Sequence, residues 1–235
     1  MIVLLIPPLF LVYKQPDMST SIVIFLIFCT LWYVGGLSSK LIIGVLAVVV
    51  PAAVILFILV LQPDQQIIET YQQTRILAWL EPEKYATGAA YQQTNAMMAI
   101  GSGQLTGKGL NNNTTTSVKN GNFISEPQTD FIFAIVGEEL GFVGCCIVIG
   151  LLLLIVVQCI LIGLRAQDLA GRIICCGVAA QIGFQSFINI GVATGILPNT
   201  GIPLPFVSYG LTSLISLYMG IGIVLNIGLQ PKKYQ

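Results

Sequence analysis

The sequence predicts an all-α, polytopic membrane protein with about six transmembrane segments and one large extracytoplasmic loop. Of its 235 residues, 55% are hydrophobic and 9% are charged, and the mean hydropathy is +0.88. A soluble domain carries about 25% charged residues. A helix that spans a bilayer needs about 20 apolar residues, and about six hydrophobic blocks flank one long polar stretch. These observations exclude an ordinary cytosolic enzyme and predict a single membrane domain over residues 1–235.

The N-terminal part of the chain holds three of the hydrophobic blocks. The first, at 2–13, is about 18 Å long as a helix, which is too short for a bilayer core of ~30 Å. It lacks the basic start and the small-residue cleavage site of a signal peptide, so we expect it to be the second half of a helix. The next two blocks, at 18–34 and 41–62, are joined by a glycine- and serine-rich turn and predict a helical hairpin.

A polar stretch from about 63 to 129 holds nearly half of the charged residues and predicts one large loop outside the membrane. Within this loop, apolar residues at helical spacing predict short helices at 67–79 and 91–100. The sequence Tyr-Gln-Gln-Thr at 71–74 recurs at 91–94. Four residues shared once do not establish a repeat.

Three more hydrophobic blocks follow, at 140–164, 170–197 and 205–230, and the basic residues between the blocks predict the orientation. Lysine and arginine in short loops mark the cytoplasmic side. One side holds five such residues, Lys40, Arg165, Arg172, Lys232 and Lys233, whereas the opposite short loop holds Lys14 alone. We therefore expect a multi-pass protein of a cytoplasmic membrane, with a cytoplasmic C-terminus and an extracytoplasmic 63–129 loop.

Composition also excludes several classes of function. The chain has no histidine, which rules out Ser-His-Asp triads and histidine-ligated zinc. The net charge is zero and there is no basic block, so a broad nucleic-acid-binding surface is not expected. All six cysteines lie in apolar blocks, which favours a packing role over disulfides. Acid–base chemistry must therefore come from carboxylates or lysines.

A glycine-rich stretch at 101–109 invites comparison with a phosphate-binding loop, because closely spaced glycines let backbone N–H groups approach an anion. It does not match the Walker pattern, since Gly109 stands where serine or threonine is needed. It does not match the dinucleotide fingerprint either, since Thr106 replaces the third glycine. A loop of tight turns is the simpler interpretation, and Lys108 keeps an anion-binding role open.

Acidic residues gather where the polar loop meets the next apolar block. Asp130 precedes a helical run and has the position of an N-cap, where aspartate accepts hydrogen bonds from free backbone N–H groups. Glu138 and Glu139 follow near the expected membrane boundary, where charge is costly and often functional. The sequence alone leaves Asp130 open to either a capping or a chemical role.

Two polar features mark the last two spans. Asn189, Gln181 and Gln185 recur at helical spacing and predict a polar stripe that faces the bundle, for which interhelical hydrogen bonding is the default explanation. Three prolines between 198 and 205 then bend the chain through a segment that includes Ser208. This spacing is typical of a re-entrant or broken helix that lines a cavity.

In chain order, these motifs resemble the SEDS family (FtsW, RodA and SpoVE). The matching segments are Gln15 to Asp17, Arg75 to Pro82, Ala99 to Gly109, Thr129 to Ala134, Gly137 to Phe142, Asn189 to Val192 and Thr200 to Gly210. Departures at Gln104, Gln128, Leu211 and Met18-Ser19 remove no charged group from the presumed centre. Family members have about ten spans, so the resemblance implies a C-terminal fragment, or a truncated gene, that lacks the first four.

The resemblance implies a peptidoglycan glycosyltransferase that polymerises lipid II outside the bacterial cytoplasmic membrane, during division, elongation or sporulation, with undecaprenyl pyrophosphate as leaving group. The aspartate of the Thr-Asp-Phe-Ile-Phe motif is essential in the family, so Asp130 is the expected catalytic base. The leaving group needs positive charge, from a divalent cation such as Mg²⁺ or Mn²⁺ or from a basic side chain. The expected substrate-binding residues are Lys108, Arg75, Asp17, Glu126 and Ser208.

The resemblance also implies a partner, a single-span class B penicillin-binding protein, whose transpeptidase activity cross-links the strands. In the family this partner contacts the spans that match 140–164 and 170–197. Two other functions stay open. A lipid II flippase would need a polar pathway through the bilayer, whereas the predicted spans are nearly uncharged. A non-catalytic scaffold that binds a penicillin-binding protein is the second alternative, if the missing spans supply substrate contacts.

Overall fold

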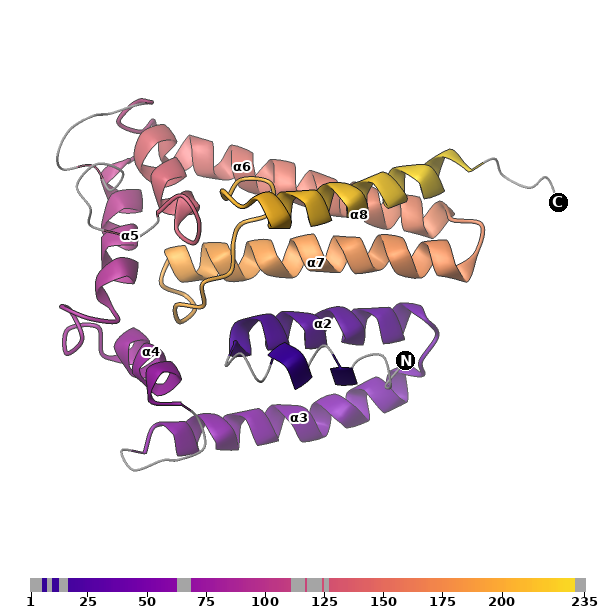
Figure 1. Cartoon of the computed structure of the whole chain (residues 1–235), viewed down its shortest axis with the longest axis horizontal. Coiled ribbons are helices and arrows are strands. Elements are labelled where there is room, and N and C mark those ends of the chain that lie inside the picture. The colour runs from indigo at the N-terminus through magenta and orange to yellow at the C-terminus, as the bar shows by residue number, and fades with distance from the viewer. Residues whose placement is uncertain are drawn as a thin grey trace.

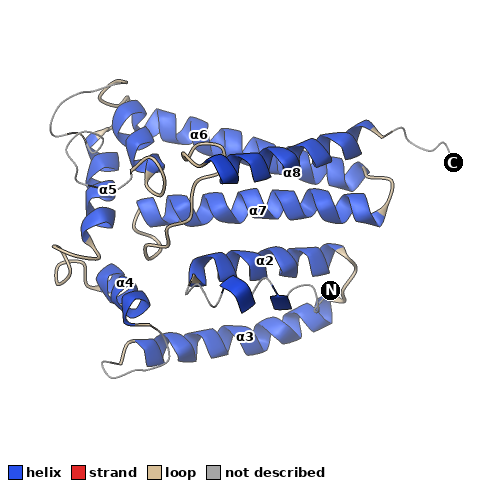
Figure 2. Cartoon of the chain, viewed as in Figure 1, coloured by secondary structure: helices blue, strands red, loops and turns tan. Residues whose placement is uncertain are grey.

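The computed structural model describes residues 6–7, 10–12, 17–62, 69–110, 117, 124 and 127–230. This part of the chain consists of helices and the loops between them, as Figure 2 shows. The prediction of an all-α protein is confirmed. Glu126 and most of the first hydrophobic block lie outside the described residues.

Seven helices of eleven or more residues make up the described part of the chain. They are α2 (Met18–Val34), α3 (Ser39–Val60), α4 (Thr70–Leu80), α5 (Tyr91–Ser102), α6 (Ile132–Arg165), α7 (Leu169–Ala193) and α8 (Leu211–Leu229). The bounds of α2 through α5 lie within about three residues of those predicted. A short turn joins α2 and α3, as predicted, whereas the tight packing of the two helices stays a prediction.

Three of these helices are long and apolar enough to cross a membrane, as judged by length and composition over the described residues. They are α6, α7 and α8, with 34, 25 and 19 residues. The segment Ser19–Val34, within α2, is a shorter apolar helix. The structure therefore shows a helical protein with several candidate membrane spans.

The long helices lie roughly side by side, whereas α4 and α5 lie across one end of them (Figure 1). Helix α7 packs against α6, α2 and α8, and α5 packs against α6 and α7. The short turns after α2 and α6 and the C-terminal end of α8 all lie at the opposite end (Figure 1). Part of the predicted polar loop is thus an ordered layer on one end of the helices.

Helix α6 begins eight residues before the predicted span at 140–164, and it is broken at Gly141. This residue has φ 66° and ψ −164°, a conformation that is open to glycine but strained for other residues. The prediction started too late because a hydropathy criterion for a span stops at Glu138 and Glu139. Both acidic residues lie on the short helical segment before the break.

Helix α8 begins at Leu211, six residues after the predicted start at 205. The expected re-entrant or broken helix at 201–210 is wrong, because residues 196–210 form a loop with a single turn at 205–208. The physical reason is that Pro203 and Pro205 lack the N–H groups that a helix needs. This loop lies over the start of α6, where it meets the predicted site.

The buried core beneath this end joins segments that are distant in the sequence. Val23 of α2, Ala96 of α5 and Val192 of α7 pack with Phe131 and Ile202 in one hydrophobic cluster. The last two residues lie in the loops before α6 and α8. All six cysteines are free thiols. Cys145, Cys159 and Cys175 are buried, which agrees with a packing role for these three, whereas Cys146 is exposed.

The two Tyr-Gln-Gln-Thr segments place their second glutamine in the same structural role. Gln73 of α4 donates from Nε2 to the Val60 and Gln62 carbonyls, both at 2.9 Å, at the end of α3. Gln93 of α5 donates from Nε2 to the Val192 carbonyl at 2.8 Å and the Leu197 carbonyl at 2.7 Å, just where α7 ends. Each glutamine thus donates to one carbonyl in the last turn of a helix and to a second carbonyl just beyond that helix.

Candidate active site

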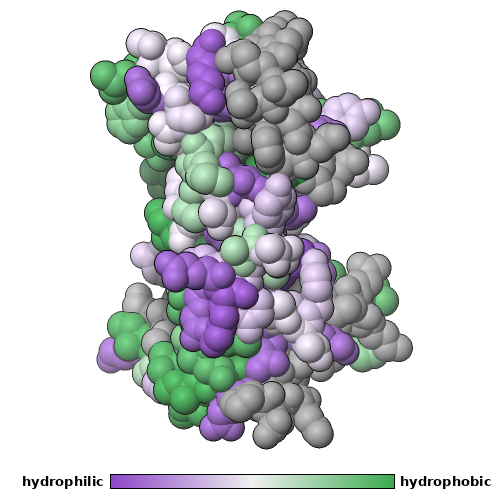
Figure 3. Space-filling model, turned by 90° about the vertical axis from the view of Figure 1, so that its left-hand side faces the viewer, coloured by the Kyte–Doolittle hydropathy of each residue, from purple (hydrophilic) through white to green (hydrophobic). Residues whose placement is uncertain are grey.

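The predicted site residues gather at the end of the helices that α4 and α5 cover. The start of α2, the helices α4 and α5, the start of α6 and the loop before α8 all lie at this end in Figure 1. Hydrophilic and weakly polar residues spread over this face, with apolar residues at its margins, as Figure 3 shows. Lys40 and Arg165 lie on segments at the opposite end. The fold thus separates the two charged sets that the sequence distinguished.

Asp130 lies in the turn that precedes α6, and its side chain is partly buried. The helix N-cap is the next residue, Phe131, and no side-chain capping hydrogen bond is formed there. The interpretation of Asp130 as an N-cap is therefore wrong. The Asp130 carboxylate does not cap α6, which leaves it available for chemistry.

Three consecutive carbonyls hold the main chain that leads to Asp130. The Gln128 carbonyl accepts from the Tyr209 N–H at 2.9 Å, and the Thr129 carbonyl accepts from the Ser208 hydroxyl at 2.6 Å. The Asp130 carbonyl accepts from Asn189 Nδ2 at 2.8 Å. All three donors come from the loop before α8 or from α7, so the Asp130 turn is fastened to both.

Ser208 is buried, and its hydroxyl is engaged with the protein backbone. It accepts from the Leu204 N–H at 2.8 Å and donates to the Thr129 carbonyl. This arrangement closes the turn at 205–208 and joins it to the Asp130 turn. The structure thus gives Ser208 a role in shaping the site, while its expected contact with substrate stays a prediction.

Gly201 lies beside the Asp130 carboxylate in a left-handed conformation, with φ +73°. A Cβ at this position would lie 3.5 Å from Asp130 Oδ2. A larger side chain would both strain the backbone and occupy the space next to the carboxylate. The glycine therefore keeps one side of Asp130 accessible.

Arg75 of α4 provides a positive charge near Asp130. Its guanidinium lies over the Tyr71 ring, 4.4 Å from the centroid, and donates to the Tyr71 hydroxyl. Its Nη1 also donates to the Asn199 carbonyl at 3.3 Å. Tyr71 precedes Arg75 by one helical turn, so the four-residue spacing was a sequence signal for this pair.

Two opposing effects act on the Asp130 carboxyl. Burial raises its pKa above the ordinary aspartate value, and the positive charge of Arg75 offsets part of this increase. A general base works best with a pKa that approaches the working pH. The surroundings of Asp130 shift its pKa in that direction.

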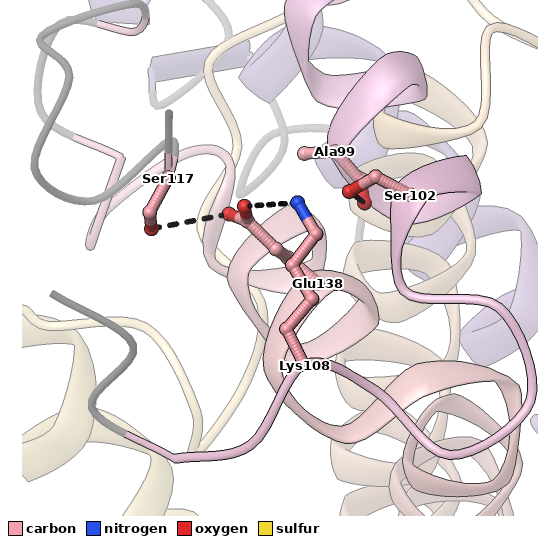
Figure 4. A network of polar contacts seen from close by, with 5 residues as sticks. All are labelled: Ala99, Ser102, Lys108, Ser117 and Glu138. Atoms are coloured by element: carbon pink, nitrogen blue, oxygen red, sulfur yellow. Dashed lines mark hydrogen bonds and ion pairs between the residues drawn. The ribbon is translucent and has the colours of Figure 1, made fainter. Parts of the chain in front are cut away.

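Lys108 lies in a separate polar network, which Figure 4 shows from close by. Its ammonium forms an ion pair with the buried Glu138 carboxylate at 3.0 Å, and the Ser117 hydroxyl donates to the other Glu138 oxygen at 3.4 Å. The pairing compensates the buried carboxylate, which is costly to bury alone. The Lys108 ammonium, which was expected to bind an anion, is thus already neutralised in part by Glu138.

The glycine-rich loop is joined to the break in α6 by its backbone. The N–H groups of Lys108 and Gly109 donate to the carbonyls of Glu138 and Glu139, at 2.9 and 3.1 Å. In the opposite direction, the N–H groups of Phe142 and Val143 donate to the carbonyls of Gln104 and Leu105, at 2.8 and 3.2 Å. Loop N–H groups that a phosphate cradle would need are therefore occupied, which supports the interpretation as a loop of tight turns.

Asp17 caps helix α2. One of its carboxylate oxygens accepts from the Thr20 N–H at 3.0 Å and the other from the Thr20 hydroxyl at 2.6 Å. A capping role was not predicted for this residue, although an aspartate directly before an apolar helical run is a helix-start signal. Its expected contact with substrate stays a prediction.

A metal centre is not assembled by the residues that the structure describes. No group of three or more histidine, cysteine, aspartate or glutamate side chains lies close enough to hold an ion in these parts of the chain. Near Asp130, the charged neighbour identified is the Arg75 guanidinium. Among the described residues, no site is thus built from three or more such side chains, and the expected divalent cation stays a prediction.

Comparison with known proteins gives a consistent result across the chain. The profile of the family described as "Cell cycle protein", which covers FtsW, RodA and SpoVE, matches residues 1–233. The peptidoglycan glycosyltransferase MrdB of Escherichia coli K12 is 40% identical over 226 residues, which cover 96% of this chain and 58% of MrdB. A probable peptidoglycan glycosyltransferase FtsW of Geobacter metallireducens is 34% identical over 230 residues, which cover 98% of this chain and 58% of that relative.

Two solved structures share the fold. One, described as "Structural coordination of polymerization and crosslinking by a peptidoglycan synthase complex", aligns with a TM-score of 0.73 and 30% identity over 96% of this chain and 60% of that chain. The other, a mutant of the rod shape determining protein RodA of Thermus thermophilus, aligns with a TM-score of 0.60 and 24% identity over 99% and 56%. The chain thus spans somewhat more than half of the proteins it matches.

Proposed function

Because this chain belongs to the FtsW, RodA and SpoVE family of cell cycle proteins, we propose that it catalyses peptidoglycan glycosyl transfer, joining lipid II units into glycan strands. The observation that carries the proposal is a partly buried carboxylate with a raised pKa, Asp130, which lies within the electrostatic influence of Arg75 at the polar end of the helices. Relatives named as peptidoglycan glycosyltransferases support the reaction class.

In the proposed reaction, the Asp130 carboxylate takes the proton from the acceptor sugar hydroxyl. The hydroxyl oxygen attacks the anomeric carbon of the donor sugar, and the bond from that carbon to the pyrophosphate oxygen breaks. The electron pair leaves with undecaprenyl pyrophosphate. Gly201 leaves room for the acceptor beside Asp130.

Arg75 is the group that we assign to the pyrophosphate of the donor. A guanidinium offers several donors in a planar fork that suits phosphate oxygens. Tyr71 and the Asn199 carbonyl hold this fork in place, so less conformational freedom is lost when the pyrophosphate binds. Lys108 would add charge only if substrate binding loosened its ion pair with Glu138.

A divalent cation such as Mg²⁺ or Mn²⁺ remains a separate proposal. A pyrophosphate brings its own oxygen ligands, and Mg²⁺ commonly needs only one or two protein carboxylates besides them. The described residues do not supply a ready-made site, so no step of the reaction is assigned to the metal.

The membrane arrangement is proposed to have about six spans, with α2, α3, α6, α7 and α8 among them. The polar end with Asp130 then faces outward, and the end with Lys40 and Arg165 faces the cytoplasm, in line with the excess of basic residues there. The membrane is proposed to be the bacterial cytoplasmic membrane, where relatives of this kind use lipid-linked substrates.

The proposed partner is a class B penicillin-binding protein, and a structural neighbour described as a peptidoglycan synthase complex supports it. The expected contact surface lies on α6 and α7. Gly177 of α7 faces Leu31 of α2, so it packs within the chain, whereas Gly150 of α6 faces open space. The outer face of α6 is therefore the better candidate for the contact.

A lipid II flippase is disfavoured by the distribution of charge. A pyrophosphate that crosses the bilayer would need polar groups along its path. After the break at Gly141, helix α6 carries charge only at its end, at Arg165, α7 carries charge only near its start, at Arg172, and α8 carries none. The end of the helices that faces the viewer in Figure 3 instead carries many polar residues.

The test is to incubate the chain in proteoliposomes with fluorescent lipid II and to measure glycan strands and released undecaprenyl pyrophosphate. A chimera in which this chain replaces the matching segment of the Escherichia coli relative is assayed in parallel. We expect polymerisation from the chimera at least. Translocation of lipid II without any polymer, or no turnover by either protein, would overturn the proposed function.

A further inference from the structure

Asn189 is an amide in the middle of the protein, 1% exposed, near the C-terminal end of α7. A buried amide is costly unless it forms hydrogen bonds, and the Asn189 oxygen, Oδ1, has no partner among the described residues. The sequence alone favoured an interhelical hydrogen bond for this residue. The structure instead directs its side chain at two loops.

Both donors of the amide are used. Asn189 Nδ2 donates to the Asp130 carbonyl at 2.8 Å and to the Ile202 carbonyl at 2.7 Å. Residues 130 and 202 are far apart in the sequence, and neither belongs to a helix. One side chain therefore fixes the distance between the turn that carries Asp130 and the loop before α8.

This distance matters for the Asp130 carboxylate itself. Gly201 directly precedes Ile202, and a Cβ at Gly201 would lie 3.5 Å from Asp130 Oδ2. The Asn189 amide thus holds the main chain of Asp130 and that of Ile202, the residue after Gly201, at a set separation. The hydrogen bonds at the Gln128 and Thr129 carbonyls fasten the same turn but lie farther from Asp130 along the chain.

We propose that Asn189 is a positioning residue for the glycosyl transfer, which holds the Asp130 main chain against Ile202 so that the carboxylate faces the acceptor hydroxyl. This inference rests on the proposed function. Asn189 touches protein carbonyls, so it acts through Asp130 on the rate of the chemical step. A misplacement of about 1 Å in such a group can cost about 100-fold in rate.

The substitution Asn189→Leu removes both donors at similar volume, and Asn189→Asp keeps the shape but removes the amide N–H groups. The matched control is Ser186→Ala. Ser186 is buried on the same helix one turn earlier, and its hydroxyl has no hydrogen-bond partner among the residues that the structure describes. We expect kcat for lipid II polymerisation to fall about 100-fold in Asn189→Leu, with KM within about twofold. Ser186→Ala is expected to match the unchanged protein.

Hydrogen–deuterium exchange of the proteins in lipid nanodiscs tests the same contact without turnover. Loss of the amide is expected to speed exchange in the peptides that cover 127–134 and 203–210, by about tenfold or more, because the Tyr209 N–H bond to the Gln128 carbonyl opens more often. Exchange within the rest of α7 is expected to stay unchanged. Should Asn189→Leu not fold, Asn189→Asp supplies the comparison.

The outcomes separate this inference from the proposed function. Full activity in both Asn189 variants, or a rise in KM with no fall in kcat, would overturn the positioning role. Equal exchange in the Asn189 variants and Ser186→Ala would overturn it as well. If the unsubstituted protein makes no polymer but exchange rises only in the Asn189 variants, the contact stands, and the catalytic part of the inference falls together with the proposed function.

Discussion

At the scale of single residues, Asp130 is defined by its surroundings rather than by its place in the sequence. Its sequence position indicated a helix cap as readily as a base. In the structure, the cap position belongs to Phe131, while burial and Arg75 act on the Asp130 pKa in opposite directions. The influence of Arg75 on the Asp130 pKa could not be predicted from a local pattern, since the two residues are 55 positions apart in the sequence.

The substitution Arg75→Gln is expected to change the pH dependence of polymerisation. Arg75 lowers the Asp130 pKa, so its removal raises that pKa. A base acts only when deprotonated, and activity is lost as the pH falls through its pKa. The acid limb of the kcat/KM profile should therefore move to higher pH.

The control for this measurement is Arg172→Gln on α7, near the opposite end of the helices. Its acid limb is expected to stay in place. An acid limb that does not move in Arg75→Gln would show that the arginine does not act on the Asp130 carboxyl, even if substrate binding is weaker.

At the scale of elements, the structure explains features that hydropathy leaves open. Long apolar helices are readable from the sequence because each needs about 20 apolar residues, and the bounds of α2 were predicted to the residue. The start of α6 was missed because Glu138 is charged, yet its buried carboxylate is paired with Lys108 from a loop 30 residues earlier. A local pattern cannot contain that partner.

The glycine-rich loop and the break in α6 show the same limit. The glycines at 101–109 suggested that another group approaches the loop backbone closely. In the structure, that group is the main chain of α6. A Cβ at Gly107 would overlap the Glu139 carbonyl, and one at Gly141 would overlap Gly107. The sequence indicated the need for glycine but could not indicate the neighbour that requires it.

The glutamine caps are expected to stabilise the protein measurably. Gln93→Leu removes the Gln93 donor from the Leu197 carbonyl and one donor from the Val192 carbonyl, which also accepts from the Gly195 N–H at 3.1 Å. A buried polar group that loses its partner costs about 1–3 kcal/mol. The free energy of unfolding, measured by titration with SDS in mixed micelles, should fall by about that amount. The neighbouring substitution Gln92→Leu, at a half-buried position, serves as the control and should change stability far less. Equal effects of the two would show that the Gln93 bonds contribute nothing.

At the scale of the whole molecule, the fold sorts its charged groups between two ends. The start of α6 and helices α4 and α5 lie at one end, and the turns after α2 and α6 lie at the other (Figure 1). A lipid-linked sugar presents its headgroup at the membrane surface, so a site at one end of the helices suits such a substrate. The sequence predicted this separation because the charges occur in polar segments that alternate along the chain.

The proposed orientation can be measured with thiol labelling in intact spheroplasts. A cysteine introduced by Thr87→Cys, in the exposed turn between α4 and α5, should react with a membrane-impermeant maleimide. A cysteine introduced by Gln167→Cys, between α6 and α7, should react only after the membrane is opened. The six native thiols lie in apolar helices, and the unsubstituted protein shows their background. The reverse pattern would place Asp130 on the cytoplasmic side and contradict the proposed chemistry.

The most direct test of the account is the polymerisation rate of Asp130→Asn, compared with Asp168→Asn as control. Asparagine keeps the size of aspartate but cannot take a proton, whereas Asp168 caps α7 through the Gly171 N–H at 3.0 Å, and asparagine caps equally well. We predict that Asp130→Asn lowers the rate by about 10²- to 10⁴-fold with unchanged thermal stability, and that Asp168→Asn stays active. An Asp130→Asn protein that polymerises lipid II at most of the original rate would contradict the assignment of Asp130 as the base.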